Sequence, residues 1–144
     1  MFSTKLSIAQ LFLRIALAVT MLSAVADRFG CWGNNAVWGN WTAFEGYTRT
    51  LTFFLPNILS KIGAYFATFC EVVFSILLLI GFKTKVIAYA TSILLLSFGI
   101  AMTIALGVKA PLDYSVWTSV AAAFLLAAQN KFPFSIDNLI NKNK

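Results

Sequence analysis

Two ionisable residues of opposite charge interrupt long apolar runs, and their types and placement could support chemistry inside a membrane. Arg14 lies within the first apolar run, and Glu71 lies at the centre of the second. A charge at bilayer depth costs from about 2.5 to above 10 kcal/mol, so such a side chain faces a bundle interior and finds a partner. Arg14 can donate hydrogen bonds to an oxygen, and Glu71 can take or give a proton. We therefore expect these two side chains to form a buried ion pair.

Polar side chains extend this candidate site at helical spacing. Gln10 lies four residues before Arg14, so the two share one helical face. Thr68 lies three residues before Glu71, and Ser75 lies four residues after it, so all three share a face. A stripe of small residues on the next apolar run is interpreted instead as a helix-packing face: Ala88, Ser92, Gly99 and Thr103.

Asp27 and Arg28 mark the outer end of the first run. They serve either as interfacial anchors or as groups that reach inward and close the site from above. They begin a long connection, residues 27–61, that is rich in aromatic residues. Loops above about 12–15 residues usually serve a function or lack order, and large rings argue against disorder. We expect an outer cap that includes Trp41 and a short interfacial helix near Trp41–Phe54. The alternative is an aromatic belt at the level of the lipid headgroups.

The elements that position these residues are four apolar runs, which predict an all-α, integral membrane four-helix bundle. A hydrocarbon core about 30 Å thick needs about 20 helical residues to cross it. The fourth run is short and relies on tilt of its neighbours or on local thinning of the bilayer. The predicted helices are Leu6–Ala26, Ile62–Ile80, Val86–Val108 and Tyr114–Gln129. We expect residues 1–144 to form a single transmembrane domain, because 144 residues allow one domain at most.

The first run has an alternative interpretation as a cleaved signal peptide. Lys5 precedes it, and Ala24-Val25-Ala26 resembles a small-residue cleavage site. The apolar region of a signal peptide is uncharged, however, whereas Arg14 interrupts this one. We therefore expect the segment to be retained as the first membrane helix.

Composition and charge agree with a membrane protein. The chain is 60% hydrophobic and 11% charged, with a mean hydropathy of +0.82, whereas soluble domains carry about 25% charged residues. The formal net charge of +6 raises nucleic-acid binding, which needs clustered basic residues with aromatic residues between them. Here the basic residues lie singly at the ends of apolar runs, as membrane proteins place them. The expected partner is therefore the lipid bilayer and not nucleic acid.

Basic residues also predict the orientation of the chain. The very short loop between the second and third runs carries Lys83 and Lys85, which favours a cytoplasmic position for that loop. Both termini are then cytoplasmic, and residues 27–61 face outward. We expect a multi-pass protein of the inner (cytoplasmic) membrane.

The residue types that the chain lacks narrow its chemistry. It has no histidine, which removes bis-histidine haem and most zinc sites, so no metal site is expected. Cys31 in the outer connection and Cys70 near mid-membrane form no CxxC motif and differ too much in depth for a disulfide. If the protein moves electrons, a bound molecule such as a quinone must carry them.

Three motifs resemble the DoxX family of small bacterial four-helix membrane proteins. The first run opens with Leu11-Phe12-Leu13-Arg14-Ile15-Ala16-Leu17, similar to the family's LLRLALG. The second run carries Glu71 where the family has E-x-x-x-G, with Ser75 in place of the glycine, and it ends in a turn similar to LLLGLFTR. The tail Phe134-Ser135-Ile136-Asp137 resembles the family's closing YSLD. In this order the motifs cover nearly the whole chain.

The resemblance implies a role in a larger system. DoxX relatives include a DoxD-type subunit linked to thiosulfate:quinone oxidoreductase and members linked to complexes that handle thiol or superoxide stress. The chain would then be a membrane subunit of an oxidoreductase system, with membrane or peripheral oxidoreductase proteins as partners. A quinone, a lipid or another small lipophilic ligand would bind near Arg14 and Glu71, the positions that carry over. Two alternative functions stay open, a structural or assembly factor for other membrane proteins and a small-solute transporter. The chain is also compatible with a homo-oligomer, and the sequence identifies no catalytic residue.

Overall fold

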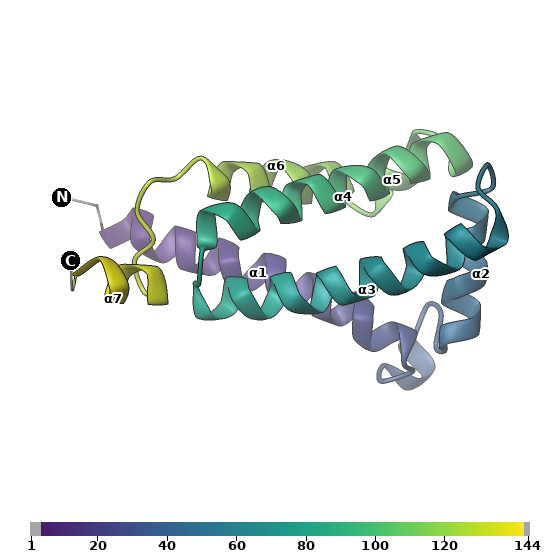
Figure 1. Cartoon of the computed structure of the whole chain (residues 1–144), viewed down its shortest axis with the longest axis horizontal. Coiled ribbons are helices and arrows are strands. Elements are labelled where there is room, and N and C mark those ends of the chain that lie inside the picture. Colours follow the sequence, from purple (N-terminus) through teal and green to yellow (C-terminus); the bar gives the residue numbers. More distant parts are fainter. Residues whose placement is uncertain (1–3, 143–144) are drawn as a thin grey trace.

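The computed structural model describes residues 4–142, which form a lengthwise bundle of helices (Figure 1). Three helices are long and apolar enough to cross a membrane: α1 (Thr4–Arg28), α3 (Asn57–Ile80) and α4 (Thr84–Leu106). They coincide with the first three predicted helices, although α3 begins earlier than predicted. The shorter elements are the 3₁₀ turn η1 (Gly33–Asn35), α2 (Trp41–Leu51), α5 (Lys109–Asp113), α6 (Val116–Ala127) and α7 (Ile136–Lys142).

The fourth predicted helix, Tyr114–Gln129, is shorter in the structure and follows a separate turn of helix. α6 has 12 residues, which is about 18 Å at 1.5 Å per residue, less than a hydrocarbon thickness of about 30 Å. α5 ends just before Ser115, whose backbone is left-handed with φ 55°. A residue in this conformation cannot lie inside a right-handed α-helix. Within residues 4–142, three helices rather than four are therefore long enough to cross a bilayer.

Large apolar side chains cover the outside of the bundle. Phe12, Phe69 and Ile93 are 72%, 66% and 67% exposed, although each lies on a long helix. Several small residues lie in the interior, where Ala18 and Ala88 are completely buried beside larger residues such as Leu78. Soluble proteins hide most large apolar side chains, whereas membrane proteins present them to lipid and place small residues where helices meet. The outer surface is therefore that of a membrane protein.

Small residues of α4 allow close packing against α6. Gly99 lies against the Trp117 ring, where an added β-carbon would come within 3.1 Å of a ring atom. The Ser92 hydroxyl donates a hydrogen bond to the Val120 carbonyl at 3.2 Å across the same interface. Both residues belong to the stripe that the sequence predicts as a packing face, so that prediction is confirmed for them.

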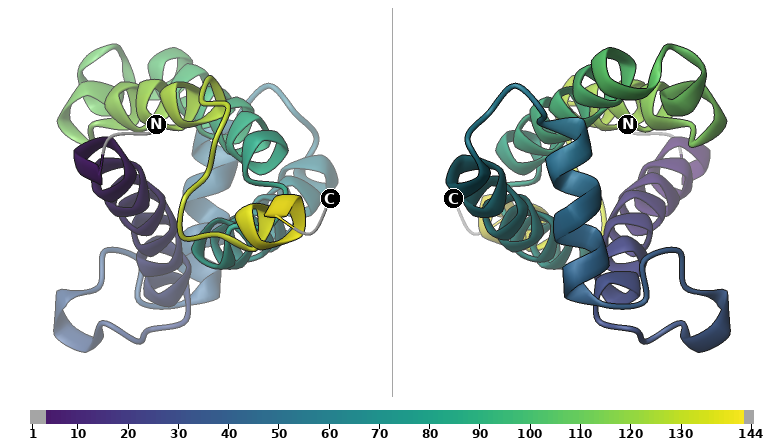
Figure 2. Two further views of the ribbon diagram at one scale, coloured as in Figure 1. Left: turned by 90° about the vertical axis from the view of Figure 1, so that its left-hand side faces the viewer. Right: turned by 90° about the vertical axis from the view of Figure 1, so that its right-hand side faces the viewer.

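Short helices lie at the two ends of the bundle (Figure 2). We call the end crossed by α2 the α2 end, and the opposite end, where α1 begins and α7 lies, the α7 end (Figure 1). α2 falls within the predicted range Trp41–Phe54. It begins there because the Asn40 side chain accepts a hydrogen bond from the Ala43 N–H at 2.9 Å, which caps the first turn.

Candidate functional site

A buried ion pair joins α1 to α3 near the α2 end. The Arg28 Nη1 atom contacts the Glu71 Oε2 atom, and each residue is 3% exposed. Arg28 is therefore the partner of Glu71, and the predicted pair between Arg14 and Glu71 is wrong. The physical reason is that Arg28, in the last turn of α1, turns inward onto α3 instead of outward as an interfacial anchor. The long Arg28 side chain extends from the end of α1 and places its guanidinium against Glu71.

Arg28 has two further contacts that hold its charge. Its Nη1 donates to the Thr68 hydroxyl at 2.6 Å, and that hydroxyl donates to the Ala64 carbonyl at 2.9 Å. The Arg28 Cζ atom lies 4.0 Å from the centroid of the Phe44 ring. A cation over an aromatic face is held more strongly where water is excluded. The guanidinium is therefore surrounded by a carboxylate, a hydroxyl and an aromatic ring.

Asp27, next to Arg28, binds the backbone of the loop that leads to α2. Its carboxylate accepts hydrogen bonds from the N–H groups of Val37 and Trp38, each at 2.8 Å, and of Gly39 at 3.3 Å. These three donors compensate a carboxylate that is almost completely buried. Asp27 thereby fixes the loop that places Trp38 within 5.8 Å of the Arg28 guanidinium. Asp27 acts on the site through the loop and not by contact with Glu71.

An aromatic cluster from α2 and its neighbours covers the ion pair. The Trp41 ring centroid lies 5.5 Å from that of Phe44 and 4.5 Å from that of Tyr65. Two buried donors beside Phe44, Arg28 Nε and Trp41 Nε1, have no acceptor among the described residues. Each buried unpaired donor costs about 1–3 kcal/mol. Such donors need an explanation in a native structure, and a ligand oxygen is one.

Tyr47 adds a neutral ring to this cluster. Its ring centroid lies 5.5 Å from that of Trp38. Burial, with a smaller contribution from Tyr114, raises the pKa of the Tyr47 phenol above its ordinary value. Tyr47 therefore stays uncharged at physiological pH and adds no charge beside Arg28.

Arg14 lies nearer the α7 end and binds only main-chain oxygens in the described structure. It is fully buried, and its Nε and Nη2 donate to the carbonyls of Leu78 and Leu79 at 2.9 and 3.0 Å. Its Nη1 donates to the carbonyls of Pro133 and Phe134 at 3.3 and 3.1 Å. The last carbonyls of a helix have no helical partner, and the helix dipole favours a cation there. Arg14 thus completes the end of α3 and ties the tail to it.

The other predicted site residues divide between the two regions. Gln10 lies with Arg14, because its Nε2 donates to the Lys131 carbonyl at 2.7 Å. Ser75 is fully buried on α3, and its hydroxyl has no partner among the described residues. The structure thus gathers five of the predicted residues near the α2 end: Asp27, Arg28, Trp41, Thr68 and Glu71.

Two surface pockets lie away from the ion pair. One of about 440 Å³ is lined by the turn before α4 and by the tail, and one of about 390 Å³ is lined by α2 and the start of α3. Neither is lined by Arg28 or Glu71. Cys31 and Cys70 are free thiols, and no cluster of three or more metal-ligating side chains occurs in residues 4–142. The pair therefore lies closed beneath the aromatic cluster.

Comparison with known proteins identifies the family. The sequence model of the DoxX family matches residues 9–104, which contain both Arg14 and the Arg28–Glu71 pair. The chain belongs to the DoxX family. No curated protein and no solved structure matches it. The DoxX match extends from α1 through most of α4, so it includes the three long apolar helices.

In this DoxX protein, three parts of the motifs that resemble the family meet at the α7 end: Arg14, the turn after α3 and the tail. Gly81 ends α3 with φ 71°, and an added β-carbon would lie only 2.8 Å from Ser135 Cα. The Asp137 carboxylate accepts hydrogen bonds from the N–H groups of Lys83 and Thr84, each at 2.7 Å. The tail therefore caps the first turn of α4. Together with the hydrogen bonds of Arg14, these contacts hold the tail against the turn between α3 and α4.

Proposed function

We propose that this DoxX protein is a membrane subunit of an oxidoreductase system and binds a quinone or a similar lipophilic carbonyl compound at Arg28 and Glu71. The observation that carries this proposal is the pair of buried donors beside Phe44, Arg28 Nε and Trp41 Nε1. A carbonyl oxygen accepts hydrogen bonds and donates none, so it matches such donors. The Trp41 and Phe44 rings offer aromatic faces to a flat ring.

The two charged residues would act on the ligand in different ways. Arg28 would hold a ligand oxygen by a charge-assisted hydrogen bond. Glu71 would exchange a proton with that oxygen, since an intramembrane carboxylate is a common proton carrier. Reduction of a quinone takes two electrons and two protons. A partner oxidoreductase would supply the electrons, Glu71 would supply one proton, and water would supply the other. This chain would supply the binding site and one proton-exchanging group.

Ligand entry would need movement of the aromatic cluster, because the ion pair is closed. α2 is tied to α3 by few polar contacts, including a surface ion pair between Glu45 and Lys61 at 3.7 Å. A second tie is the hydrogen bond between the Thr52 and Ser60 hydroxyls at 2.7 Å. Exposed ion pairs contribute about 0–1 kcal/mol. Displacement of α2 would also have to separate Trp41 from Tyr65 and Phe44 from the Arg28 guanidinium, so these aromatic contacts contribute most of the cost of opening the site.

The topology proposed for this function places both termini in the cytoplasm of an inner-membrane protein. Lys83 and Lys85 would then lie at the cytoplasmic face, in agreement with the positive-inside rule. The α2 end and the Arg28–Glu71 pair would lie toward the outer leaflet. A quinone would reach the pair from the lipid phase beside the single transmembrane domain.

The test measures binding of a short-chain quinone to the full chain in nanodiscs. Binding is detected as quenching of the tryptophan fluorescence of the protein. We expect saturable binding that Arg28→Gln weakens about tenfold or more, the loss expected for a hydrogen bond from a charged group. Arg49→Gln is the matched control, because Arg49 is exposed on α2 and makes the same change of charge. Binding that is absent, or that Arg28→Gln leaves unchanged, would rule out this function.

A further inference from the structure

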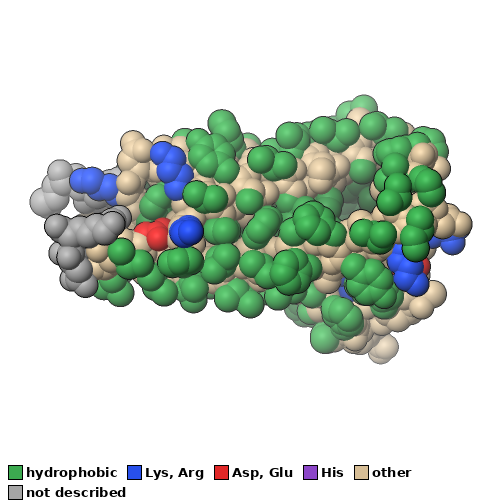
Figure 3. Space-filling view, in the orientation of Figure 1, with side chains coloured by type: hydrophobic (Ala, Val, Ile, Leu, Met, Phe, Trp, Pro, Cys, Tyr) green, Lys and Arg blue, Asp and Glu red, His purple; other side chains and the backbone are tan. Residues whose placement is uncertain are grey.

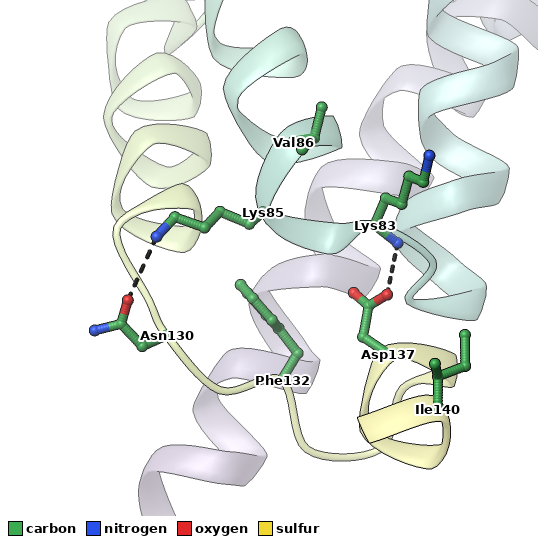
Figure 4. A pocket seen from close by; sticks show the side chains of 7 residues that line it. All are labelled: Lys83, Lys85, Val86, Asn130, Phe132, Asp137 and Ile140. Carbon is green, nitrogen blue, oxygen red and sulfur yellow. Dashed lines mark hydrogen bonds between the residues drawn. The ribbon is translucent and has the colours of Figure 1, made fainter. Parts of the chain in front are cut away.

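A pocket at the α7 end has features that the proposed quinone site does not use. Its volume is about 440 Å³, and it is formed by the turn between α3 and α4 and by the tail (Figure 4). Lys83, Lys85 and Asn130 line it on its polar side. It lies at the opposite end of the bundle from α2, so a ligand here would be independent of Arg28 and Glu71.

The carboxylate that lines this pocket is occupied by the main chain. Asp137 accepts hydrogen bonds from the N–H groups of Lys83 and Thr84, each at 2.7 Å, and the first of these is drawn in Figure 4. The Lys85 ammonium has a long contact, 3.4 Å, with the neutral Asn130 side chain. Among residues 4–142, neither Lys83 nor Lys85 has an ion-pair partner. No carboxylate among these residues therefore neutralises either ammonium by contact. The Lys85 side chain extends toward Asn130, and the Lys83 side chain extends to the other side of the pocket, where its ammonium lies 5.8 Å from the centroid of the Phe82 ring (Figure 4).

Lysines at the other end of the bundle are different. Lys61 is paired with Glu45 at 3.7 Å, and Lys109 is paired with Asp113. A space-filling view also shows a red side chain beside a blue one near the α7 end (Figure 3). The Asp137 carboxylate, which lines the pocket, accepts hydrogen bonds from backbone N–H groups and forms no ion pair with Lys83 or Lys85. The two lysines at the α2 end are thus neutralised by carboxylates, whereas Lys83 and Lys85 are not.

Apolar side chains line the rest of the pocket. Val86 is 62% exposed, Ile140 is 44% exposed, and Phe132 is half-buried. Val86 lies in the first turn of α4, a helix long and apolar enough to cross a membrane. The pocket is therefore at the level where a spanning helix leaves the hydrocarbon core. Ammonium groups beside apolar side chains at that level match an amphiphile that carries a negative headgroup.

We infer that this pocket binds the phosphate headgroup of an anionic phospholipid, with the acyl chains running along Val86 and the outer face of α4. Charge complementarity selects an anionic headgroup over a zwitterionic one. Each lysine near the surface of an anionic membrane contributes about 1 kcal/mol, or roughly fivefold in affinity. The lipid is held by the ammonium groups, and the apolar lining distinguishes it from free phosphate.

The backbone at Lys83 makes a clean test available. Its φ is 47°, a left-handed conformation that glycine adopts without strain. Lys83→Gly therefore removes the charge and keeps the turn, and Lys85→Gln removes the second charge at an exposed position while it keeps a polar side chain beside Asn130. The double variant Lys61→Gln/Lys109→Gln is the control, because it removes the same charge from the opposite end.

The experiment measures lipid binding to the delipidated full chain by native mass spectrometry. The probes are phosphatidylglycerol, phosphatidylcholine with the same acyl chains, and inorganic phosphate. We expect phosphatidylglycerol to bind at least tenfold more tightly than phosphatidylcholine. Lys83→Gly/Lys85→Gln should weaken it about 25-fold, from two lysines at roughly fivefold each, and the control by less than threefold.

Three results would overturn the inference. The first is equal affinity for the two lipids, and the second is an unchanged affinity in Lys83→Gly/Lys85→Gln. The third is occupancy by inorganic phosphate at the concentration at which the lipid saturates, which would make the site one for free anions. If the double variant does not fold, Lys85→Gln decides, with an expected loss of about fivefold and an unchanged affinity as the contrary result.

Discussion

The Arg28 guanidinium contacts the Glu71 carboxylate, and this contact separates the roles of the two arginines of α1. Arg14 lies deeper in the helix, and its hydrogen bonds go to main-chain carbonyls at the end of α3 and in the tail. Arg28 lies at the end of the helix and neutralises the buried acid. One arginine therefore completes the fold, and the other forms the charged centre of the candidate site.

A double-mutant cycle tests this assignment. Arg28→Gln and Glu71→Gln should each lower the free energy of unfolding by about 3–5 kcal/mol, because each leaves one buried charge without its partner. The double variant should be more stable than additivity predicts by about 1–3 kcal/mol. The measurement is unfolding in mixtures of mild detergent and dodecyl sulfate. Strict additivity would mean that the two side chains do not interact.

A second double-mutant cycle, which combines Arg14→Gln with Glu71→Gln, is the control for the first. Arg14→Gln should destabilise the fold, since carbonyls of α3 and the tail lose their donor. Combined with Glu71→Gln, it should give additive losses within about 0.5 kcal/mol, the range for residues that share no partner. Coupling of more than 1 kcal/mol between Arg14 and Glu71 would contradict the contacts described above.

Asp27→Asn should loosen the loop before α2 without unfolding the bundle. The uncharged amide accepts hydrogen bonds less strongly than the carboxylate, and its own N–H₂ group opposes one backbone donor. We expect hydrogen exchange to quicken at the amides of Val37 and Trp38 by about tenfold, for a local loss of about 1–2 kcal/mol. Glu45→Gln, which removes an exposed ion pair, should leave those amides unchanged. Unaltered exchange in Asp27→Asn would show that the carboxylate does not hold the loop.

Gly81→Ala should strongly destabilise the protein. The φ of 71° is unfavourable for alanine by about 1–2 kcal/mol, and the new methyl group would meet the Ser135 backbone at 2.8 Å. We expect a total loss of about 2–5 kcal/mol when overpacking is included. Gly63→Ala on α3 is the control, because nothing lies within 4 Å and its backbone is helical. That control should be neutral or stabilising by up to about 1 kcal/mol, and equal effects of the two substitutions would contradict the packing at the turn.

Asp137→Ala should release the tail from the turn before α4. The substitution removes the acceptor of two backbone N–H groups at a helix N-terminus, which costs about 0.5–2 kcal/mol for a cap. Limited proteolysis should then cut the chain near Asn138 faster than in the native protein. Asn138→Ala serves as the comparison, because its side chain is exposed. Cleavage at the native rate in Asp137→Ala would show that the cap does not hold the tail.

The long helices could be predicted from the sequence because bilayer thickness sets their length and few charges interrupt them. The three predicted runs at Leu6–Ala26, Ile62–Ile80 and Val86–Val108 agree with α1, α3 and α4 to within a few residues. The break before α6 was not predicted, since Ser115 carries no local signal for a left-handed backbone. Apolar composition alone does not reveal such a break.

The candidate site was predicted in part. Helical spacing correctly placed Thr68 on the face of Glu71, and the charge of each residue indicated that it needed a partner. The prediction chose Arg14 over Arg28 because it compared only the positions of the residues along the helices, and it was wrong for two reasons. The long Arg28 side chain reaches Glu71 from the end of α1, and the unpaired carbonyls at the end of α3 bind Arg14. The sequence does contain a signal: Arg28 lies 14 residues after Arg14, about four helical turns, so the two side chains fall on the same side of α1.

The indole N–H resonances of the tryptophans test the central claim most directly, that Arg28 and Trp41 donate to an oxygen of a lipophilic ligand. In ¹⁵N-labelled protein, a short-chain quinone should shift the Trp41 resonance, assigned by its loss in Trp41→Phe. It should leave Trp32 unchanged, because Trp32 Nε1 already donates to the Ser23 carbonyl at 3.0 Å. The Trp41 shift should disappear in Arg28→Gln. A Trp41 resonance that does not respond, or that responds equally in Arg28→Gln, would contradict the claim.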